Sequence, residues 1–227
     1  MLATRAADRA QRGVLPLAVA TSLLAGLLLW SAAHAGLPQF RDKAMPIRLA
    51  CSPIAAVLVP GTGWLIRRGG RRRFPFPYTP SLLVTLPLII DLAGNATGLY
   101  DGLEYFDDAV HFVNPLLLVS ATGLLLARTG VPRWTVWIMA FGLGCAGNIA
   151  WELMEYVLME GVGAVALHLS LRDTLSDQAW GVLGAAAGAT VAVLSASRTI
   201  PRPVVVQPLW SSEDPGPRAR TTLVTTP

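Results

Sequence analysis

Charged residues are scarce in this sequence of 227 residues. Aspartate, glutamate, lysine and arginine together make up 14% of it, against about 25% in ordinary globular proteins. Hydrophobic residues make up 53%, and the mean hydropathy is +0.51. This composition excludes a soluble globular protein, because most of such a chain must contact lipid rather than water. We therefore expect an all-α, polytopic membrane protein.

Cysteine is also rare, and several functional signals are absent. The two cysteines, Cys51 and Cys145, both lie within apolar runs, which excludes a disulfide framework and a zinc knuckle. The net charge of +4 is not accompanied by a basic surface with interleaved aromatic residues, so we expect no nucleic-acid partner. The sequence contains no internal repeat, phosphate-binding loop or dinucleotide fingerprint.

Long apolar runs are the main positive feature of the sequence. A bilayer core about 30 Å thick requires about 20 apolar residues in a helix. We expect a short N-terminal segment at 1–12, a membrane domain at 13–196 and a disordered tail at 197–227, which is rich in Pro, Ser and Thr. The membrane domain contains six apolar runs, and these predict a helical bundle with spans at 13–35, 47–66, 78–94, 107–127, 134–159 and 174–195.

The first run has a second interpretation. Arg5, Arg9 and Arg12 precede an apolar stretch that ends in Ala33-His34-Ala35, which resembles a signal peptide with a small-residue cleavage site. The run is longer than the roughly 7–15 apolar residues of most signal peptides, and this favours a span that is retained. Both interpretations give the later spans the same orientation.

The positions of the basic residues predict that orientation. If the N-terminus is cytoplasmic, Arg41, Lys43, Arg48 and Arg172 lie in outside segments, and the other 14 of the 18 lysines and arginines lie in cytoplasmic segments. Cytoplasmic loops carry such an excess of positive charge. We therefore expect both termini to lie in the cytoplasm. We expect the membrane to be the plasma membrane.

The acidic residues are distributed in the opposite way. An ionised side chain at the centre of a span costs about 2.5–3.5 kcal/mol on insertion, so acids inside spans are functional candidates. The helical rise places His111 and Glu152 at one depth, with Asp91 and Asp177 close to that level. Seven acids lie at or inside the outer ends of predicted helices: Asp91, Asp107, Asp108, Glu152, Glu155, Asp173 and Asp177.

Helical spacing places these polar groups on common faces. Asp107 shares a face with His111, and Asp173 shares one with Asp177. Asn148, Glu152 and Glu155 form a third face. A stripe of small residues continues the face of Asp177 and favours close packing of another helix; it consists of Gly181, Gly184 and Gly188.

A simpler interpretation treats the acids as charges at helix ends. It suits Asp107, Asp108 and Asp173, which begin helices where negative charge is favourable. It suits Glu152 and Glu155 poorly, because they lie near a helix C-terminus. By sequence, Arg172 is the only basic residue beside the cluster, so we expect the acids to share protons, bind a cation or face water.

Three functions are compatible with this pattern. The first is an outward-facing, metal-dependent enzyme that acts on a lipid or cell-envelope substrate, because carboxylates with one histidine suit a divalent metal. The second is a structural or assembly protein with a stabilising ion, and the third is a proton or cation transporter. For the enzyme, Asp108 and His111 are catalytic candidates, and Asp91, Asn148 and Arg172 are further polar residues of the site. The candidate metal ligands are Asp107, His111, Glu152, Glu155, Asp173 and Asp177.

Three motifs in order carry a family resemblance. They are Phe-Asp-Asp-Ala-Val-His-Phe at 106–112, Trp-Glu-Leu-Met-Glu-Tyr at 151–156 and Arg-Asp-Thr-Leu-Ser-Asp at 172–177. Together they resemble the YjdF-type bacterial inner-membrane proteins and, more distantly, VanZ-like proteins, over about residues 91–189. The resemblance implies a multi-pass membrane protein. Its VanZ-like side, which is associated with glycopeptide resistance, implies a connection with the cell envelope.

Overall fold

The computed structural model describes residues 2–41, 43, 45–68, 76–160 and 171–196. The tail predicted at 197–227 lies outside the described residues. The described residues form helices and no strand, which confirms the all-α prediction. The elements are α1 (Leu2–Ala33), the short 3-10 helix η1 (Pro38–Phe40), α2 (Met45–Arg68), α3 (Tyr78–Thr97), α4 (Leu99–Gly102), α5 (Phe106–Ala127), α6 (Arg133–Glu160) and α7 (Leu171–Ala196).

Six of these helices are long and apolar enough to cross a membrane, each with a stretch of 20 residues or more. This confirms the prediction of a multi-pass membrane protein. The candidate spans are Gly13–Ala33, Met45–Leu65, Tyr78–Thr97, Phe106–Ala127, Arg133–Val157 and Leu171–Ala196.

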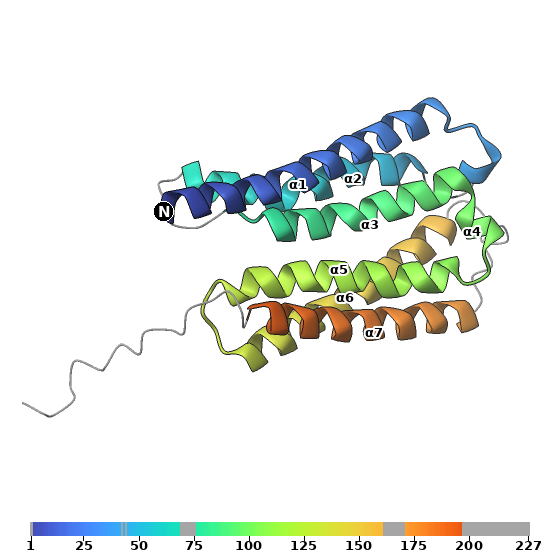
Figure 1. The fold of residues 1–227 in the computed structure, drawn as a ribbon. Helices are drawn as coiled ribbons and strands as arrows, with labels where there is room; N and C mark the ends of the chain where they lie inside the picture. The colour runs from blue at the N-terminus through green and yellow to red at the C-terminus, as the bar shows by residue number, and fades with distance from the viewer. Residues whose placement is uncertain (1, 42, 44, 69–75, 161–170, 197–227) are drawn as a thin grey trace, which may run out of the picture.

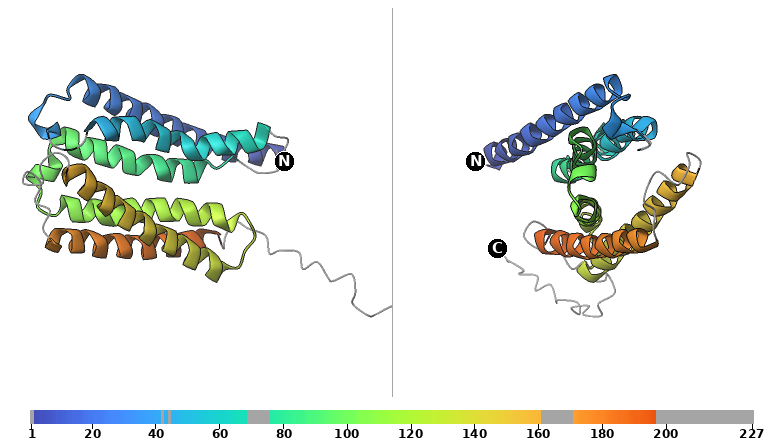
Figure 2. Two further views of the ribbon diagram at one scale, coloured as in Figure 1. Left: turned by 180° about the vertical axis from the view of Figure 1, so that it is seen from behind. Right: turned by 90° about the vertical axis from the view of Figure 1, so that its right-hand side faces the viewer.

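The six long helices form two groups of three (Figure 1). One group contains α1, α2 and α3, and the other contains α5, α6 and α7. Helix α3 packs against α5 and joins the groups. All six helices run roughly along one direction, so α1, α3 and α6 end where α2, α5 and α7 begin (Figures 1 and 2). We call this end of the bundle the acidic end.

Each group has its own apolar core. In the first group, Leu24 of α1, Met45 of α2 and Leu92 of α3 are buried together with Phe40 of η1. In the second group the buried residues are mostly small; they are Val119 of α5, Ala140 of α6, and Ala185 and Ala189 of α7. Small side chains at this core let the three helices approach closely.

The closest approach is between α5 and α7, which form the most extensive helix pair in the described chain. A Cβ atom on Gly184 would collide with the backbone carbonyl oxygen of Phe112, and one on Gly188 would lie 2.5 Å from that of Leu116. The hydroxyl of Ser120 donates a hydrogen bond of 3.2 Å to the carbonyl oxygen of Gly188. The predicted close packing along the glycine stripe is confirmed.

This contact yields a stability prediction. Replacing Gly184 by leucine forces α7 away from the α5 backbone, and we expect the free energy of unfolding to fall by about 1–3 kcal/mol or more. Gly142→Leu is the matched control, because Gly142 of α6 is exposed and a Cβ there meets no atom within 4 Å. Thermal unfolding in detergent micelles measures both variants. Equal melting temperatures for the two variants would contradict the proposed helix contact.

Candidate functional site

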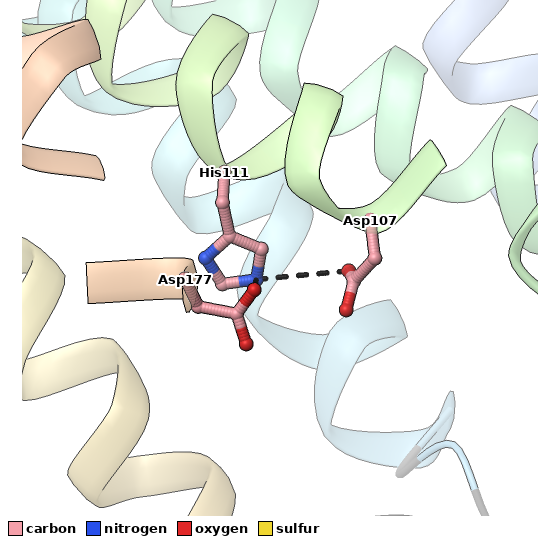
Figure 3. Close-up of side chains that lie close together, drawn as sticks. All are labelled: Asp107, His111 and Asp177. Carbon is pink, nitrogen blue, oxygen red and sulfur yellow. Dashed lines mark ion pairs between the residues drawn. The ribbon is translucent and has the colours of Figure 1, made fainter. Parts of the chain in front are cut away.

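His111 is the centre of a polar cluster at the acidic end. The histidine comes from the second turn of α5 and is 8% exposed. Its Nε2 atom lies 3.6 Å from Oδ1 of Asp107, one turn earlier on α5, and 3.9 Å from Oδ1 of Asp177 on α7. Figure 3 shows the two carboxylates beside the same edge of the imidazole ring. We call Asp107, His111 and Asp177 the Nε2 group.

The other ring nitrogen faces helix α6. Oε1 of Glu152 lies 3.5 Å from Nδ1 of His111. Glu152 is 8% exposed, and its buried Oε1 has no hydrogen-bond partner among the described residues. Glu155, one turn further along α6, completes a second set of carboxylates around the same imidazole. We call His111, Glu152 and Glu155 the Nδ1 group.

The spacing within both groups is that of metal ligands. In each group the candidate ligand atoms lie within 4.8 Å of one another. The nitrogen–oxygen distances of 3.5–3.9 Å are longer than those of hydrogen bonds, which are about 2.7–3.2 Å. The carboxylates therefore lie around the imidazole without being hydrogen-bonded to it, and the donor atoms of each group are close enough together to hold a metal ion.

Two sequence features act on α5, α6 and α7, the helices that contribute side chains to these groups. Pro115 has no backbone N–H, so the carbonyl of His111, four residues earlier, lacks the donor that a helix normally supplies. Nδ2 of Asn148 donates a hydrogen bond of 3.1 Å to Oε1 of Gln178, and Nε2 of Gln178 donates one of 3.4 Å to the carbonyl oxygen of Asn148. These bonds join α6 and α7 one turn before Glu152 and directly after Asp177.

Three further predicted residues lie around this centre. The hydroxyl of Ser176 donates a hydrogen bond of 2.8 Å to Oδ1 of Asp108, so Asp108 contacts α7 from the first turn of α5. Asp173 is half-buried and close enough to Asp107 and His111 to interact with them electrostatically. Arg172 is exposed at the start of α7.

The main basic neighbour of the acids is Arg48, at the start of α2, and not Arg172. Its guanidinium forms an ion pair with Asp91 of α3 through Nη1 and lies 3.5 Å from Oε1 of Glu155 through Nη2. It also lies over the ring of Trp151, 5.6 Å from the ring centroid. The expectation that Arg172 is the only basic residue beside the cluster is therefore wrong. A charged residue inside a predicted span is the signal that identifies Arg48.

Asp91 is surrounded by donors besides Arg48. The hydroxyl of Tyr100 donates to its Oδ1 at 3.2 Å, and Nδ2 of Asn95 contacts the same oxygen at 3.4 Å. Gly98 ends α3 with φ of 71°, which glycine adopts without strain, and the chain then turns so that Tyr100 reaches Asp91. Burial and, secondarily, the Asp91 carboxylate raise the pKa of Tyr100 above its usual value, so the phenol keeps its proton and remains a donor.

The comparison with protein families covers the whole site. Residues 16–198 match the family described as predicted membrane protein, DUF2238. The chain belongs to this family. The match includes every residue of the Nε2 and Nδ1 groups, together with Arg48, Asp91 and Tyr100. No curated protein and no solved structure matches the sequence of this DUF2238 protein.

Two ion pairs of this DUF2238 protein differ in burial and yield a second prediction. The side chain of Asp91 is 17% exposed beside Arg48, whereas that of Asp101 is 60% exposed beside Lys43. Loss of the Asp91 carboxylate leaves the guanidinium of Arg48 with Glu155 as its acidic partner among the described residues. Breaking a buried pair costs about 3–5 kcal/mol, whereas an exposed pair contributes about 0–1 kcal/mol. We expect Asp91→Asn to lower the melting temperature strongly and Asp101→Asn to change it little. Thermal unfolding of both purified variants is the measurement, and similar shifts would show that the Arg48 pair is not important for stability.

Proposed function

We propose that this protein is a membrane-embedded, metal-dependent enzyme whose centre lies near the extracytoplasmic face of the cell membrane. The Nε2 group is the proposed metal site, with Asp107, His111 and Asp177 as ligands. The observation that carries the proposal is the convergence of two carboxylates on one nitrogen of a buried histidine, inside segments apolar enough to span a membrane. Ionisable residues at such positions are usually functional.

The donor set fits a divalent metal. Imidazole nitrogen with carboxylate oxygens suits zinc, iron or manganese, and magnesium accepts the carboxylates. Two ligands that each lie about 2.1 Å from an ion are separated by about 3.0–3.4 Å, depending on the coordination geometry. The observed separations of 3.6 and 3.9 Å from Nε2 are slightly larger, so small side-chain movements suffice to bring the ligands to an ion.

The neighbouring carboxylates have separate roles in this proposal. A bound ion supplies Lewis acidity and lowers the pKa of a water ligand. Glu152 positions the imidazole, because the unpartnered Oε1 is the acceptor for an Nδ1 proton when Nε2 faces the metal. Such a carboxylate partner commonly fixes the tautomer of a ligating histidine. Asp108 is the proposed general base, and its hydrogen bond from Ser176 restricts the direction of its carboxylate.

The place of the site in the bundle supports a substrate from the membrane or the envelope. The ligands lie in the first two turns of α5 and α7, at the acidic end of the bundle, and the end of a membrane span is the level at which lipid headgroups are found. The excess of arginine at the opposite end favours an orientation in which the acidic end lies outside the cytoplasm. The resemblance of the three motifs to YjdF-type and VanZ-like proteins agrees with a role at the cell envelope.

A structural role for the same ion is the second candidate. It is favoured by the number of helices that meet at His111, since α5, α6 and α7 all contribute side chains to it. A transporter is less well supported. The Asp, Glu, Lys, Arg and His residues of the six candidate spans lie at the acidic end, apart from Arg133 at the opposite end of α6. The spans therefore contain no chain of carboxylates, histidines and basic residues from one end to the other.

Metal content is the direct test of the proposed site. We expect the detergent-purified protein to hold about one divalent ion per chain, and His111→Ala and Asp177→Asn each to lose it because each removes one of the three ligands. Mass spectrometry of the metal measures the stoichiometry, with exposed Glu104→Gln as the control that keeps the ion. Variants that lose the ion but keep their membrane level and melting temperature favour the enzyme, and variants that vanish from the membrane favour the structural role. A metal-free wild-type protein overturns both.

The proposed orientation has its own test. Two alternative reporters fused after the last residue distinguish the orientations. A fluorescent protein becomes fluorescent when it is in the cytoplasm, whereas alkaline phosphatase is active only outside the cytoplasm. We expect the fluorescent fusion to be bright and the phosphatase fusion to be inactive, because the proposed orientation has both termini in the cytoplasm. A second phosphatase fusion after Gly102, at the acidic end, is expected to be active. The reverse pattern would place the site at the cytoplasmic face.

A further inference from the structure

The Nε2 group and the Nδ1 group share one imidazole, that of His111. A neutral imidazole has a lone pair on one nitrogen and a proton on the other, so one ion at a time can use it as a ligand. The Nε2 and Nδ1 groups have similar dimensions. Distance alone therefore does not decide which of the two groups binds a metal.

Arg48 distinguishes the two sides. Its Nη2 lies 3.5 Å from Oε1 of Glu155, a member of the Nδ1 group, and its Nη1 pairs with Asp91. The guanidinium keeps its positive charge at every physiological pH. A divalent ion between Glu152 and Glu155 would lie beside this fixed charge and be repelled by it.

On the Nε2 side, no arginine or lysine of the described part of the chain forms an ion pair with Asp107 or Asp177. Among the described residues, the ion pairs formed by Asp107 and Asp177 are those with His111. Glu152 is shared between the two sides, since its unpartnered Oε1 faces His111 while Glu155 follows it on the same helix. Asp91 and Glu155 thus share a permanently charged partner, whereas Asp107 and Asp177 face the imidazole of His111.

We propose that the guanidinium of Arg48 occupies a second cation position, lined by Asp91 and Glu155, and thereby keeps the centre mononuclear. This inference rests on the proposed metal site of the Nε2 group, and it adds a separate role for Arg48. Removal of the guanidinium leaves the carboxylates of Asp91 and Glu155 without the cation that lies between them, and Glu152 is close to Glu155 on α6. Such an all-carboxylate site suits a hard divalent cation such as Mn²⁺.

The experiment counts Mn²⁺ ions bound to the detergent-purified full chain. We expect about one ion in the wild type and about two in Arg48→Gln, with a return to one in Arg48→Gln/Glu155→Gln. Arg48→Lys, which keeps the charge, is the matched control and stays at one. An Arg48→Gln protein that is folded and still holds one ion overturns the inference and leaves the proposed function intact.

A variant with intact Arg48 tests the same inference without removing the buried arginine. Glu155→Gln is expected to keep the single ion, because Glu155 belongs to the arginine and not to the metal, whereas Asp177→Asn loses it. Loss of the ion in Glu155→Gln overturns the inference. A wild type with no ion, combined with one ion in Arg48→Gln, overturns the proposed function and leaves the Arg48 site standing.

Discussion

Negative charge inside a membrane-spanning bundle must be compensated close by, and this requirement governs how the acidic end is built. Carboxylates from α3, α5, α6 and α7 meet there, and an ionised group without a partner is expensive inside a membrane. The molecule satisfies part of the requirement itself, with Arg48 between Asp91 and Glu155. On the other side, the ion pairs that Asp107, Glu152 and Asp177 form among the described residues are all with the one imidazole of His111. The proposed divalent cation would balance the negative charge of the Nε2 group.

Packing and electrostatics depend on one another in this arrangement. Two carboxylates can face one histidine nitrogen across α5 and α7 only if the helix backbones lie almost in contact, and Gly184 and Gly188 make that contact possible. The hydrogen bonds between Asn148 and Gln178 then set α6 against α7 beside the same centre. The apolar part of the interface brings the carboxylates together, and these carboxylates are the basis of the proposed metal site.

Much of this arrangement could be predicted from the sequence. Six apolar runs predicted the helical membrane fold, because span length is set by the bilayer and is read directly from composition. The i, i+4 spacing put Asp107 with His111 on one face, and the glycine stripe predicted a close neighbour for α7. These are properties of single helices, which local periodicity determines.

The remaining features depend on which helices are neighbours, and periodicity within one helix contains no such information. Arg48 lies about 43 positions before Asp91 and more than 100 before Glu155, so its pairing with both could not be predicted from spacing. The same is true of Asp108, whose partner Ser176 belongs to another helix, and of the division of the carboxylates between the two nitrogens of His111. Tyr100 reaches Asp91 only because the chain reverses after Gly98.

The glycine contact between α5 and α7 also has a mechanical consequence. All three members of the Nε2 group are carried by these two helices, whose backbones lie against each other as one rigid element. Arg48 belongs to the other group of helices and reaches α6 through its side chain alone. A displacement of α1, α2 and α3 relative to the rest would therefore change the distance between Arg48 and Glu155 while the Nε2 group kept its shape. The proposed metal site and the guanidinium of Arg48 therefore belong to different groups of helices.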